Sequence, residues 1–539
     1  MMKRDNRLLA IVSALVCGFL GGWLIWTGTQ QGAGIGGDAT IYITSARNLL
    51  AGRGLGLINP AGDFRLIPYF PPFYPLLLAF FGLFGWDPAS SARVLNIALF
   101  ALTVFLVSFH FSRISGKWLA GAIYGGLTAL SPILIPAYSW AMSETLCMFL
   151  MMVGFIALER FLSQGRCGWL VLSALGCGLS FLTRYSSAAC ILAACLILLI
   201  FQSKKIKNRF WETFLFGVIA VLPMIIWLAY DIRMTDTVAS RSVLESVSFQ
   251  QEAVRFNGQM RDIVLQWFLP DSWATSGQIP FWALQLLYGM TLVFPLAVLL
   301  WIALIDRENE DPRVRSLNRY AQIFSLFFYC YVLVVMLVSL TTYPPITIGS
   351  RMLIPAHVSF LTLLAWTFAR LGCCCRNRVW QKGMLAAALF GFALVYGMRS
   401  VRTARQNALD GLGYNAVRWK NSETIAYLRN QVPEDQTLVT NEETAVLYLL
   451  DRASWPMHEV YVTQPDPIYY SYEEGAIKDS DTGRRAFSDG RALLVVFDSF
   501  EDQMADIYGA DTSRRIEALF RNLAIVTDTD DGVIYRLKE

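Results

Sequence analysis

The chain is dominated by long apolar runs that alternate with short polar connections. About eleven of these runs approach or reach the roughly 20 residues that a helix needs to cross the hydrocarbon core of a membrane. We predict one membrane-spanning helix for each run, although the two runs on either side of Arg184 could also form one long kinked helix. The predicted spans are residues 8–28, 92–112, 118–137, 142–162, 168–183, 185–201, 212–231, 281–304, 321–341, 352–370 and 382–398.

The composition agrees with a membrane protein. Of 539 residues, 55% are hydrophobic and only 16% are charged, which is too little charge for the surface of a soluble protein of this length. The net charge of +4 is too small to suggest a nucleic-acid partner. No CxxC pair of cysteines occurs, so neither a zinc site nor a disulfide framework is supported. The expected fold class is therefore a polytopic α-helical membrane protein.

Basic residues predict the orientation of the spans. They gather in the loops on one side of successive spans, and the side with more lysine and arginine in its short loops is normally cytoplasmic. We therefore expect a multi-pass protein of the cell (inner or plasma) membrane with a cytoplasmic N-terminus. Residues 1–400 would form a transmembrane domain whose large external loops are residues 29–91 and 232–280, followed by an external or periplasmic domain at 401–539.

The segment after residue 400 has the pattern of a small α/β domain. Helical spacing of apolar residues occurs at 422–431, 500–510 and 514–523, and Ser422 has the position of an N-cap. Strand patterns occur at 437–440 and 491–497, and residues 524–537 read as a hairpin around Asp-Gly. No glycine loop for a nucleotide occurs in this segment. We expect a cap or an acceptor-docking domain rather than a second enzyme.

The first external loop carries two short apolar helices. From Asp38 onward, apolar residues recur at spacings of three and four for about fourteen residues, and glycines at 52 and 54 end the pattern. A second short helix is expected within residues 69–85, after the prolines at 71, 72 and 75. Both are too short to span, so we predict that they lie in the membrane interface and wall a cavity.

Several polar residues interrupt apolar surroundings near the external face. Glu144, Arg184, Arg351 and His357 lie at external ends of predicted spans, on the same face as Asp38, and polar groups in such places are often functional. Simpler explanations exist for each type. Asp38 could be a helix N-cap worth about 1 kcal/mol, and the arginines, including Arg93 at the start of the second span, could reach toward lipid headgroups.

Several short motifs resemble the GT-C glycosyltransferases, in the family-39-like branch that contains protein O-mannosyltransferases and the lipid A aminoarabinose transferase. Asp38 and Tyr42 are followed by the segment Ala46 to Gly52, by "YFPPFYPLL" and by "ARVLNI", as in the first external loop of that family. The later motifs "MSETL", "LSFLTRYS" and "SRMLIPAHVSFLTLL" follow in the expected order. The resemblance covers residues 8–400, whereas the segment after residue 400 matches only in position.

The resemblance implies a GT-C fold with two juxtamembrane helices, a polyprenyl-phosphate-linked sugar as donor, and an acidic residue of the first loop as catalytic base. By position that residue is Asp38. Arg184 and Arg351 would bind the donor phosphate, with Arg47 and Arg93 as weaker candidates. Further substrate contacts are expected from Glu144, Tyr42, Tyr69 and His357. A single base would invert the anomeric centre, and Glu144 as a second carboxylate would permit retention. No metal site and no required cofactor are expected, although some relatives bind a divalent cation.

The chain also departs from the family pattern. Ala39 follows Asp38 where the mannosyltransferases have a second acidic residue, and Phe70 stands where the lipid A transferases have a lysine. The sugar is therefore left open, and the acceptor could be a lipid, a glycan or a protein. Two other function classes also fit in part: a transporter or flippase of a lipid-linked sugar without transfer chemistry, and a structural assembly subunit, for which Asp38 would be dispensable.

Overall fold

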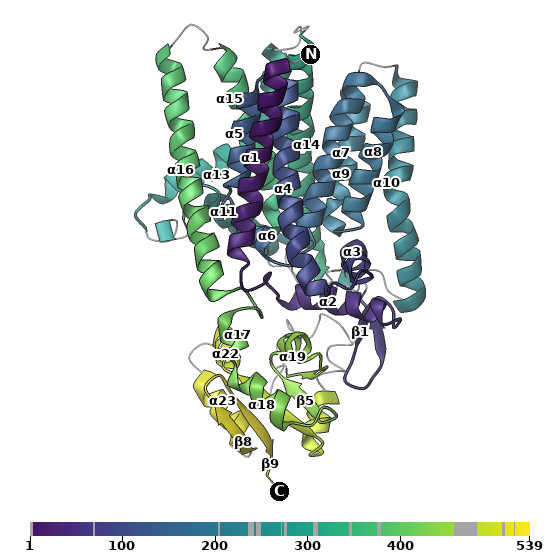
Figure 1. The fold of residues 1–539 in the computed structure, drawn as a ribbon, viewed down its shortest axis with the longest axis vertical. Coiled ribbons are helices and arrows are strands. Elements are labelled where there is room, and N and C mark those ends of the chain that lie inside the picture. The colour runs from purple at the N-terminus through teal and green to yellow at the C-terminus, as the bar shows by residue number, and fades with distance from the viewer. Residues whose placement is uncertain are drawn as a thin grey trace.

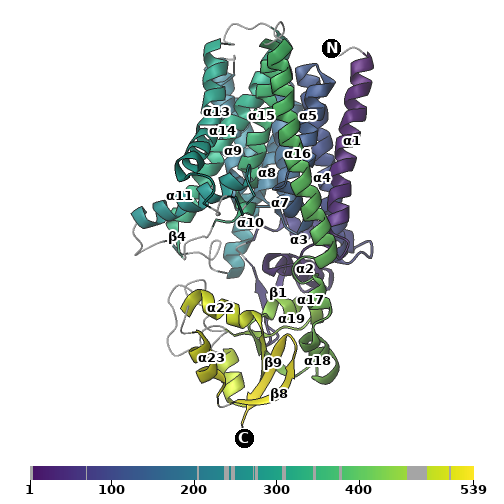
Figure 2. The ribbon, with the colours of Figure 1, turned by 90° about the vertical axis from the view of Figure 1, so that its left-hand side faces the viewer.

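The structure, a computed structural model, is a bundle of helices with a smaller α/β region beyond one end (Figure 1). It describes residues 4–538 apart from 68–69, 203–204, 236–241, 244–248, 271, 274–276, 306–310, 344–347, 375–378, 458–481, 509–511 and 522. The N-terminal end of the chain lies at the end of the bundle away from the α/β region, and Figure 2 shows the same two-part arrangement from the side.

Every predicted span falls on one or more helices of the bundle. Seven helices of the described residues are long and apolar enough to cross a membrane, so the chain is a multi-pass membrane protein, and the count of eleven spans stays a prediction. The long helices are α1 (Arg4–Gly28), α4 (Pro88–Ser115), α7 (Glu144–Gln164), α10 (Ile206–Thr235), α13 (Phe281–Ile305), α14 (Pro312–Thr341), α15 (Ile354–Cys374) and α16 (Val379–Asp410). The shorter ones are α5 (Trp118–Ala129), α6 (Leu134–Ser139), α8 (Cys167–Phe181) and α9 (Ala188–Ile200).

Two breaks in the helices depart from regular spans. The predicted span 118–137 is divided into α5 and α6 on either side of Pro132, which has no backbone N–H to continue a helix. At Arg184 the chain takes an extended conformation and then a short 3-10 helix, Tyr185–Ser187, before α9 begins. The two runs beside Arg184 are therefore separate helices, and the single kinked helix is wrong.

The outer helices leave large apolar side chains uncovered. Phe19 on α1, Ile226 on α10 and Leu304 on α13 are each more than 60% exposed. Inside the bundle, large side chains such as Phe155 and Phe324 are fully buried and stack edge to face. Exposed apolar faces around a packed interior are what a helical bundle presents to lipid.

The first loop contains the two helices that the sequence predicts. They are α2 (Gly37–Leu50) and α3 (Phe73–Gly82), with a small hairpin of β1 (Gly56–Ile58) and β2 (Phe64–Leu66) between them. α2 ends just before Gly52, which has a positive φ of 74°. The N-cap of α2 is Gly36, and no side chain caps this helix. The expectation that Asp38 is the N-cap is therefore wrong: Asp38 lies in the first turn, one residue into the helix.

The segment between α10 and α13 contributes a further helix, α11 (Phe249–Gln266), and a two-residue strand, β3 (Ser242–Val243). β3 pairs with β4 (Thr342–Tyr343), which follows α14 directly. α11 packs against α13 and α14 and brings its C-terminal residue, Gln266, to the end of the bundle where α2 lies.

The C-terminal region contains a five-stranded sheet in the order β6-β5-β7-β9-β8. β5 pairs in parallel with β6 and β7, and β9 pairs antiparallel with β7 and β8. The predicted hairpin, both predicted strands and all three predicted helices occur here, and Ser422 caps α18 by accepting a hydrogen bond from the Ile425 N–H. The elements are α17 (Val417–Lys420), α18 (Glu423–Gln431), β5 (Thr437–Thr440), α19 (Glu443–Leu450), β6 (Trp455–Pro456), β7 (Ala492–Phe497), α22 (Ser499–Tyr508), α23 (Thr512–Phe520), β8 (Leu523–Thr529) and β9 (Gly532–Leu537).

Candidate functional site

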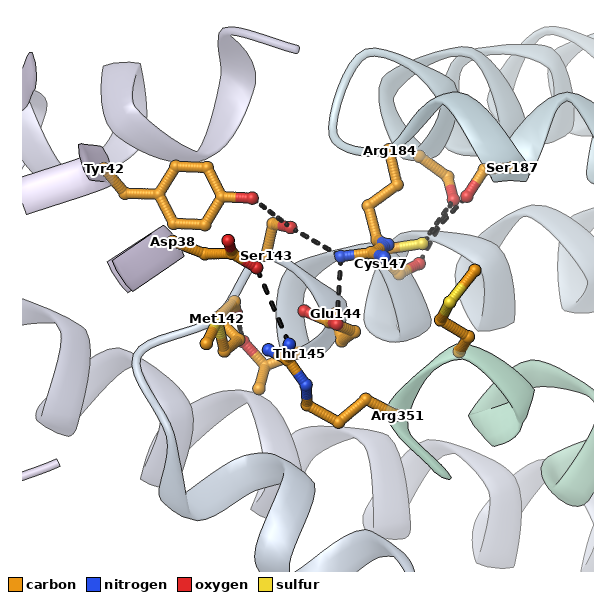
Figure 3. Close-up of polar contacts among 12 residues, drawn as sticks. Asp38, Tyr42, Met142, Ser143, Glu144, Thr145, Cys147, Arg184, Ser187 and Arg351 are labelled. Atoms are coloured by element: carbon orange, nitrogen blue, oxygen red, sulfur yellow. Dashed lines mark hydrogen bonds and ion pairs between the residues drawn. The ribbon is translucent and has the colours of Figure 1, made fainter. Parts of the chain in front are cut away.

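Asp38 and Arg351 meet at the wall of a large cavity at one end of the bundle. Arg351 Nη2 lies 3.6 Å from Asp38 Oδ2, and the two side chains remain 44% and 41% exposed (Figure 3). The cavity has a volume of about 590 Å³, within the range of small-molecule sites. Its lining comes from α2, from the segment around Pro132 and α6, from the C-terminal end of α11, from the short 3-10 helix Ser350–Leu353 with the start of α15, and from Arg399 of α16. A carboxylate and a guanidinium are thus both accessible in a space that could hold a ligand.

Two opposing effects act on the Asp38 carboxyl. Partial burial raises its pKa above the ordinary value because a less solvated carboxylate is less stable, and the nearby Glu144 carboxylate raises it further. The charges of Arg351 and Arg184 oppose this rise, because they favour the ionised form. The net result is a raised pKa, which makes Asp38 a stronger base than a fully hydrated carboxylate.

The extended segment before α2, which contains Gly34 and Ile35, fixes the position of Asp38. The Gly34 N–H donates to the Ser139 carbonyl at 2.8 Å, and the Ala141 N–H donates to the Gly34 carbonyl at 2.9 Å. On the other side, the Tyr414 N–H donates to the Ile35 carbonyl at 2.8 Å. The segment is therefore held between the membrane bundle and the chain that leads from α16 into the C-terminal region.

A second polar pair lies beside Asp38 and Arg351. Arg184 Nη1 is 2.9 Å from Glu144 Oε1, and the Glu144 side chain is only 8% exposed. Arg184 also donates to the Ser143 hydroxyl at 3.2 Å, and that hydroxyl lies 3.2 Å from the hydroxyl of Tyr42 (Figure 3). A small pocket is lined by Glu144, Arg184 and Arg351 together, so the pair adjoins the larger cavity.

Two of the predicted phosphate-binding arginines are held elsewhere. Arg47 forms an ion pair with Asp87 at 2.9 Å and thereby joins the end of α2 to the N-cap of α4. Arg93 donates to the Thr29 hydroxyl at 3.2 Å, which joins α4 to the end of α1. Neither arginine lines the cavity of Asp38. Both contacts connect elements of the bundle. No contact of Arg47 or Arg93 among the described residues supports their predicted role in phosphate binding.

Of two further predicted substrate contacts, His357 does not line the cavity. His357 is fully buried, with its Nε2 at 2.9 Å from the Ser131 hydroxyl and its ring against Trp267. His357 is therefore a packed histidine inside the bundle. Tyr69 lies outside the described residues.

The structure adds two cavity residues that sequence reasoning missed. Arg399, which directly follows the last predicted span, and Gln266, the last residue of α11, both line the cavity with Asp38. The Arg399 Nη2 donates to the Gln266 carbonyl at 3.0 Å. The run of basic residues after the last span was the signal for Arg399, whereas nothing in the local pattern marked Gln266.

Within the described part of the chain, no group of three or more His, Cys, Asp or Glu side chains is arranged to hold a metal ion. The polar groups of the site are one half-exposed carboxylate, one paired carboxylate and several arginines. Such a set is suited to proton abstraction beside a bound anion.

Residues 70–227 match the protein family described as dolichyl-phosphate-mannose-protein mannosyltransferase, and no curated protein sequence matches the chain. The fold is similar to that of the apo oligosaccharyltransferase from Archaeoglobus fulgidus, with a TM-score of 0.52 and 12% identity over 98% of this chain and 74% of that one. A weaker likeness, with a TM-score of 0.46 and 13% identity, covers 98% of this chain and 97% of ArnT from Cupriavidus metallidurans bound to undecaprenyl phosphate. The matched family segment contains Glu144 and Arg184 but ends long before Arg351.

These findings confirm the GT-C resemblance and the fold class that the sequence predicted: a polytopic helical protein with juxtamembrane helices and a C-terminal α/β region. The family match also indicates glycosyltransferase activity in general.

Proposed function

Because the chain is a multi-pass membrane protein with the GT-C fold, we propose that it moves a sugar from a polyprenyl-phosphate donor to an acceptor hydroxyl. The observation that carries this proposal is the accessible Asp38 carboxylate beside Arg351 in a cavity of about 590 Å³. In the proposed orientation, the N-terminus is cytoplasmic and the cavity opens at the external face, beside the C-terminal region.

Asp38 is the base in the proposed reaction. An acceptor hydroxyl is a weak nucleophile until a group takes its proton, and a carboxylate with a raised pKa does this better than a fully hydrated one. The acceptor oxygen then attacks the anomeric carbon, the bond from that carbon to the phosphate oxygen breaks, and the polyprenyl phosphate leaves as an anion. The proton ends on Asp38 and passes to solvent.

Arg351 is the main donor-phosphate ligand. It is half exposed in the cavity, and its guanidinium can offer two parallel N–H groups to a phosphate. An arriving phosphate would compete with Asp38 for Arg351, so binding of the donor would release the carboxylate for proton abstraction. Arg399 lies on the same cavity and adds a second positive charge.

The Glu144–Arg184 pair favours inversion of the anomeric centre. A retaining reaction needs a second carboxylate free to attack the sugar. Glu144 is almost fully buried, is bound to Arg184 at 2.9 Å, and does not line the larger cavity. We therefore assign this pair to the support of the site wall, where Glu144 orients Arg184, and Asp38 remains the single base.

The test is a transfer assay with Asp38→Asn. The protein is reconstituted with labelled polyprenyl-phosphate sugars and a cell-envelope extract as the source of acceptors, and released polyprenyl phosphate is measured. Loss of a general base should slow release by roughly 10²–10⁴-fold. Asp63→Asn is the matched control, because Asp63 lies in an exposed turn of the same loop and its hydrogen bonds among the described residues are to Asn59.

The same assay separates the competing functions. A flippase would move the label across the membrane and release no polyprenyl phosphate. Near-normal release by a folded Asp38→Asn variant would refute the base assignment and would favour a structural role for the loop.

A further inference from the structure

A second cavity lies at the end of the bundle opposite to Asp38. It has a volume of about 510 Å³ and is formed where α1 and α14 begin and where α4 and α7 end. In Figure 1 this is the end that carries the N-terminus, away from the C-terminal sheet. Glycosyl transfer at Asp38 makes no use of it, because the whole thickness of the bundle separates the two cavities.

Arginines from four separate helices converge on this cavity. Its described lining includes Arg7 of α1, Arg113 of α4, Arg160 of α7 and Arg313 of α14, and the one acidic side chain among the described lining residues is Glu159. Basic side chains on one membrane face are common, because they set orientation, but such residues normally point outward into water and headgroups. The orientation of the protein in the membrane does not by itself require arginines from four helices to line one cavity.

The Glu159 carboxylate has its own partners inside the bundle. Its Oε1 accepts a hydrogen bond from the Ser163 hydroxyl at 2.5 Å, and its Oε2 lies 3.6 Å from His110 Nε2 and 3.9 Å from Arg160 Nε. The side chain is only 1% exposed. Glu159 therefore offsets part of the positive charge of the cavity from inside the bundle. The described lining still has more basic than acidic groups.

The carboxyl end of α4 helps to hold one of these arginines at the cavity. α4 ends at Gly116, which has a φ of 72°, and a Cβ added there would lie 2.9 Å from Arg313 Nη1. The guanidinium of Arg313 is thus seated against the carboxyl end of α4, one turn from Arg113. The hydroxyls of Ser163 and Ser316, 3.0 Å apart, line the same hollow and supply hydrogen bonds.

We propose that this arginine cavity, defined by Arg7, Arg113, Arg160 and Arg313, binds the phosphate-bearing headgroup of an anionic membrane lipid. The planar guanidinium of arginine offers two parallel N–H groups to the oxygens of a phosphate diester, and a cavity at the ends of spanning helices lies at the depth of the headgroups. Free inorganic phosphate offers the same chemistry, but it lacks the acyl chains that would hold it at the apolar rim.

The test counts lipids that remain on the purified full-length chain. The protein in neutral detergent is mixed with equal amounts of phosphatidylglycerol and phosphatidylcholine, and bound lipid is measured by native mass spectrometry. Each basic group near a membrane surface is worth roughly fivefold in affinity for an anionic lipid, so the double variant Arg113→Gln/Arg160→Gln should bind phosphatidylglycerol about 30-fold more weakly. Arg166→Gln is the matched control, because Arg166 is an exposed arginine next to the same membrane face that does not line the cavity.

Three outcomes would overturn the proposal. These are equal retention of phosphatidylglycerol by the double variant and the wild type, an equal loss in Arg166→Gln, and displacement of the lipid by millimolar inorganic phosphate, which would assign the cavity to a free anion. If the double variant fails to fold by gel filtration, Arg7→Gln replaces it. Arg7 is exposed at the start of α1, and its loss should weaken retention roughly fivefold.

Discussion

Gly413→Ala should reduce sugar transfer although Gly413 lies outside the cavity. Gly413 has a positive φ of 56°. It forms an isolated β-bridge with Ile35, which lies three residues before Asp38. A Cβ added at Gly413 would overlap the Ile35 carbonyl oxygen and would lie 2.7 Å from its carbon and 2.9 Å from Trp140 Cζ3. Carbon atoms normally meet at about 3.5 Å or more, so the two segments must separate by roughly 1 Å.

The size of the effect follows from that displacement. A shift of about 1 Å at a reacting group can cost on the order of 100-fold in rate, and Asp38 is carried by the segment that must move. Alanine in the left-handed region adds a stability cost of roughly 1–2 kcal/mol, and loss of the hydrogen bond from Tyr414 to Ile35 adds about 1 kcal/mol. The assay measures polyprenyl phosphate release and thermal unfolding of the same preparations.

Gly490→Ala isolates the conformational part of this cost. Gly490 also has a positive φ, of 70°, but a Cβ there would meet nothing within 4 Å. It should lose stability to a similar extent without a loss of transfer beyond that due to unfolding. Equal transfer by folded Gly413→Ala and Gly490→Ala would refute the reasoning that the contact with Ile35 positions Asp38.

Three further predictions test the site and its support. The raised pKa of Asp38 implies that kcat/KM falls on the acidic side of a pH–rate profile, where the carboxylate becomes protonated. Arg351→Gln removes a positive charge that lowers this pKa, so the acidic limb should move to higher pH. An unmoved limb would contradict the pairing of Asp38 with Arg351. Glu144→Gln leaves the Arg184 charge without its partner and should lower the free energy of unfolding by on the order of 3 kcal/mol, measured by chemical denaturation against wild type, and a loss below about 1 kcal/mol would show that the pair is not structural. Ser422→Ala removes the N-cap of α18 and should cost about 1 kcal/mol of stability without an effect on transfer, and an unchanged melting temperature would show that the cap is not needed.

Local sequence patterns were sufficient for most of the secondary structure. The apolar runs predicted the helices of the bundle. Whether a segment of about 20 residues can cross a membrane as a helix depends mainly on its own length and composition. Ser422 marked the start of a helix and Asp-Gly marked a hairpin, since both signals act within three or four residues. The first-loop helices α2 and α3 were likewise predictable from spacing and proline positions.

Local patterns misjudged Asp38 as a helix cap. An aspartate at the start of a helical pattern is a good N-cap only if the helix begins at the next residue. Here the preceding segment pairs with Trp140 and Gly413, and this pairing lets α2 begin at Gly37. The position of the helix start was set by contacts from elements distant in the chain, which no local pattern contains.

By itself, the sequence determined that this protein is a bundle of membrane-spanning helices with polar residues gathered near one face, and that Asp38 stands in the first loop beside it. Only the tertiary structure decided which of these polar residues meet. In the structure, Asp38 contacts Arg351, and Arg184 forms an ion pair with Glu144. His357 is buried in the packed interior, and Arg399 lines the cavity. The physical reason is that helix formation depends on neighbours a few residues away, whereas the convergence of side chains depends on how whole helices rotate and pack against each other.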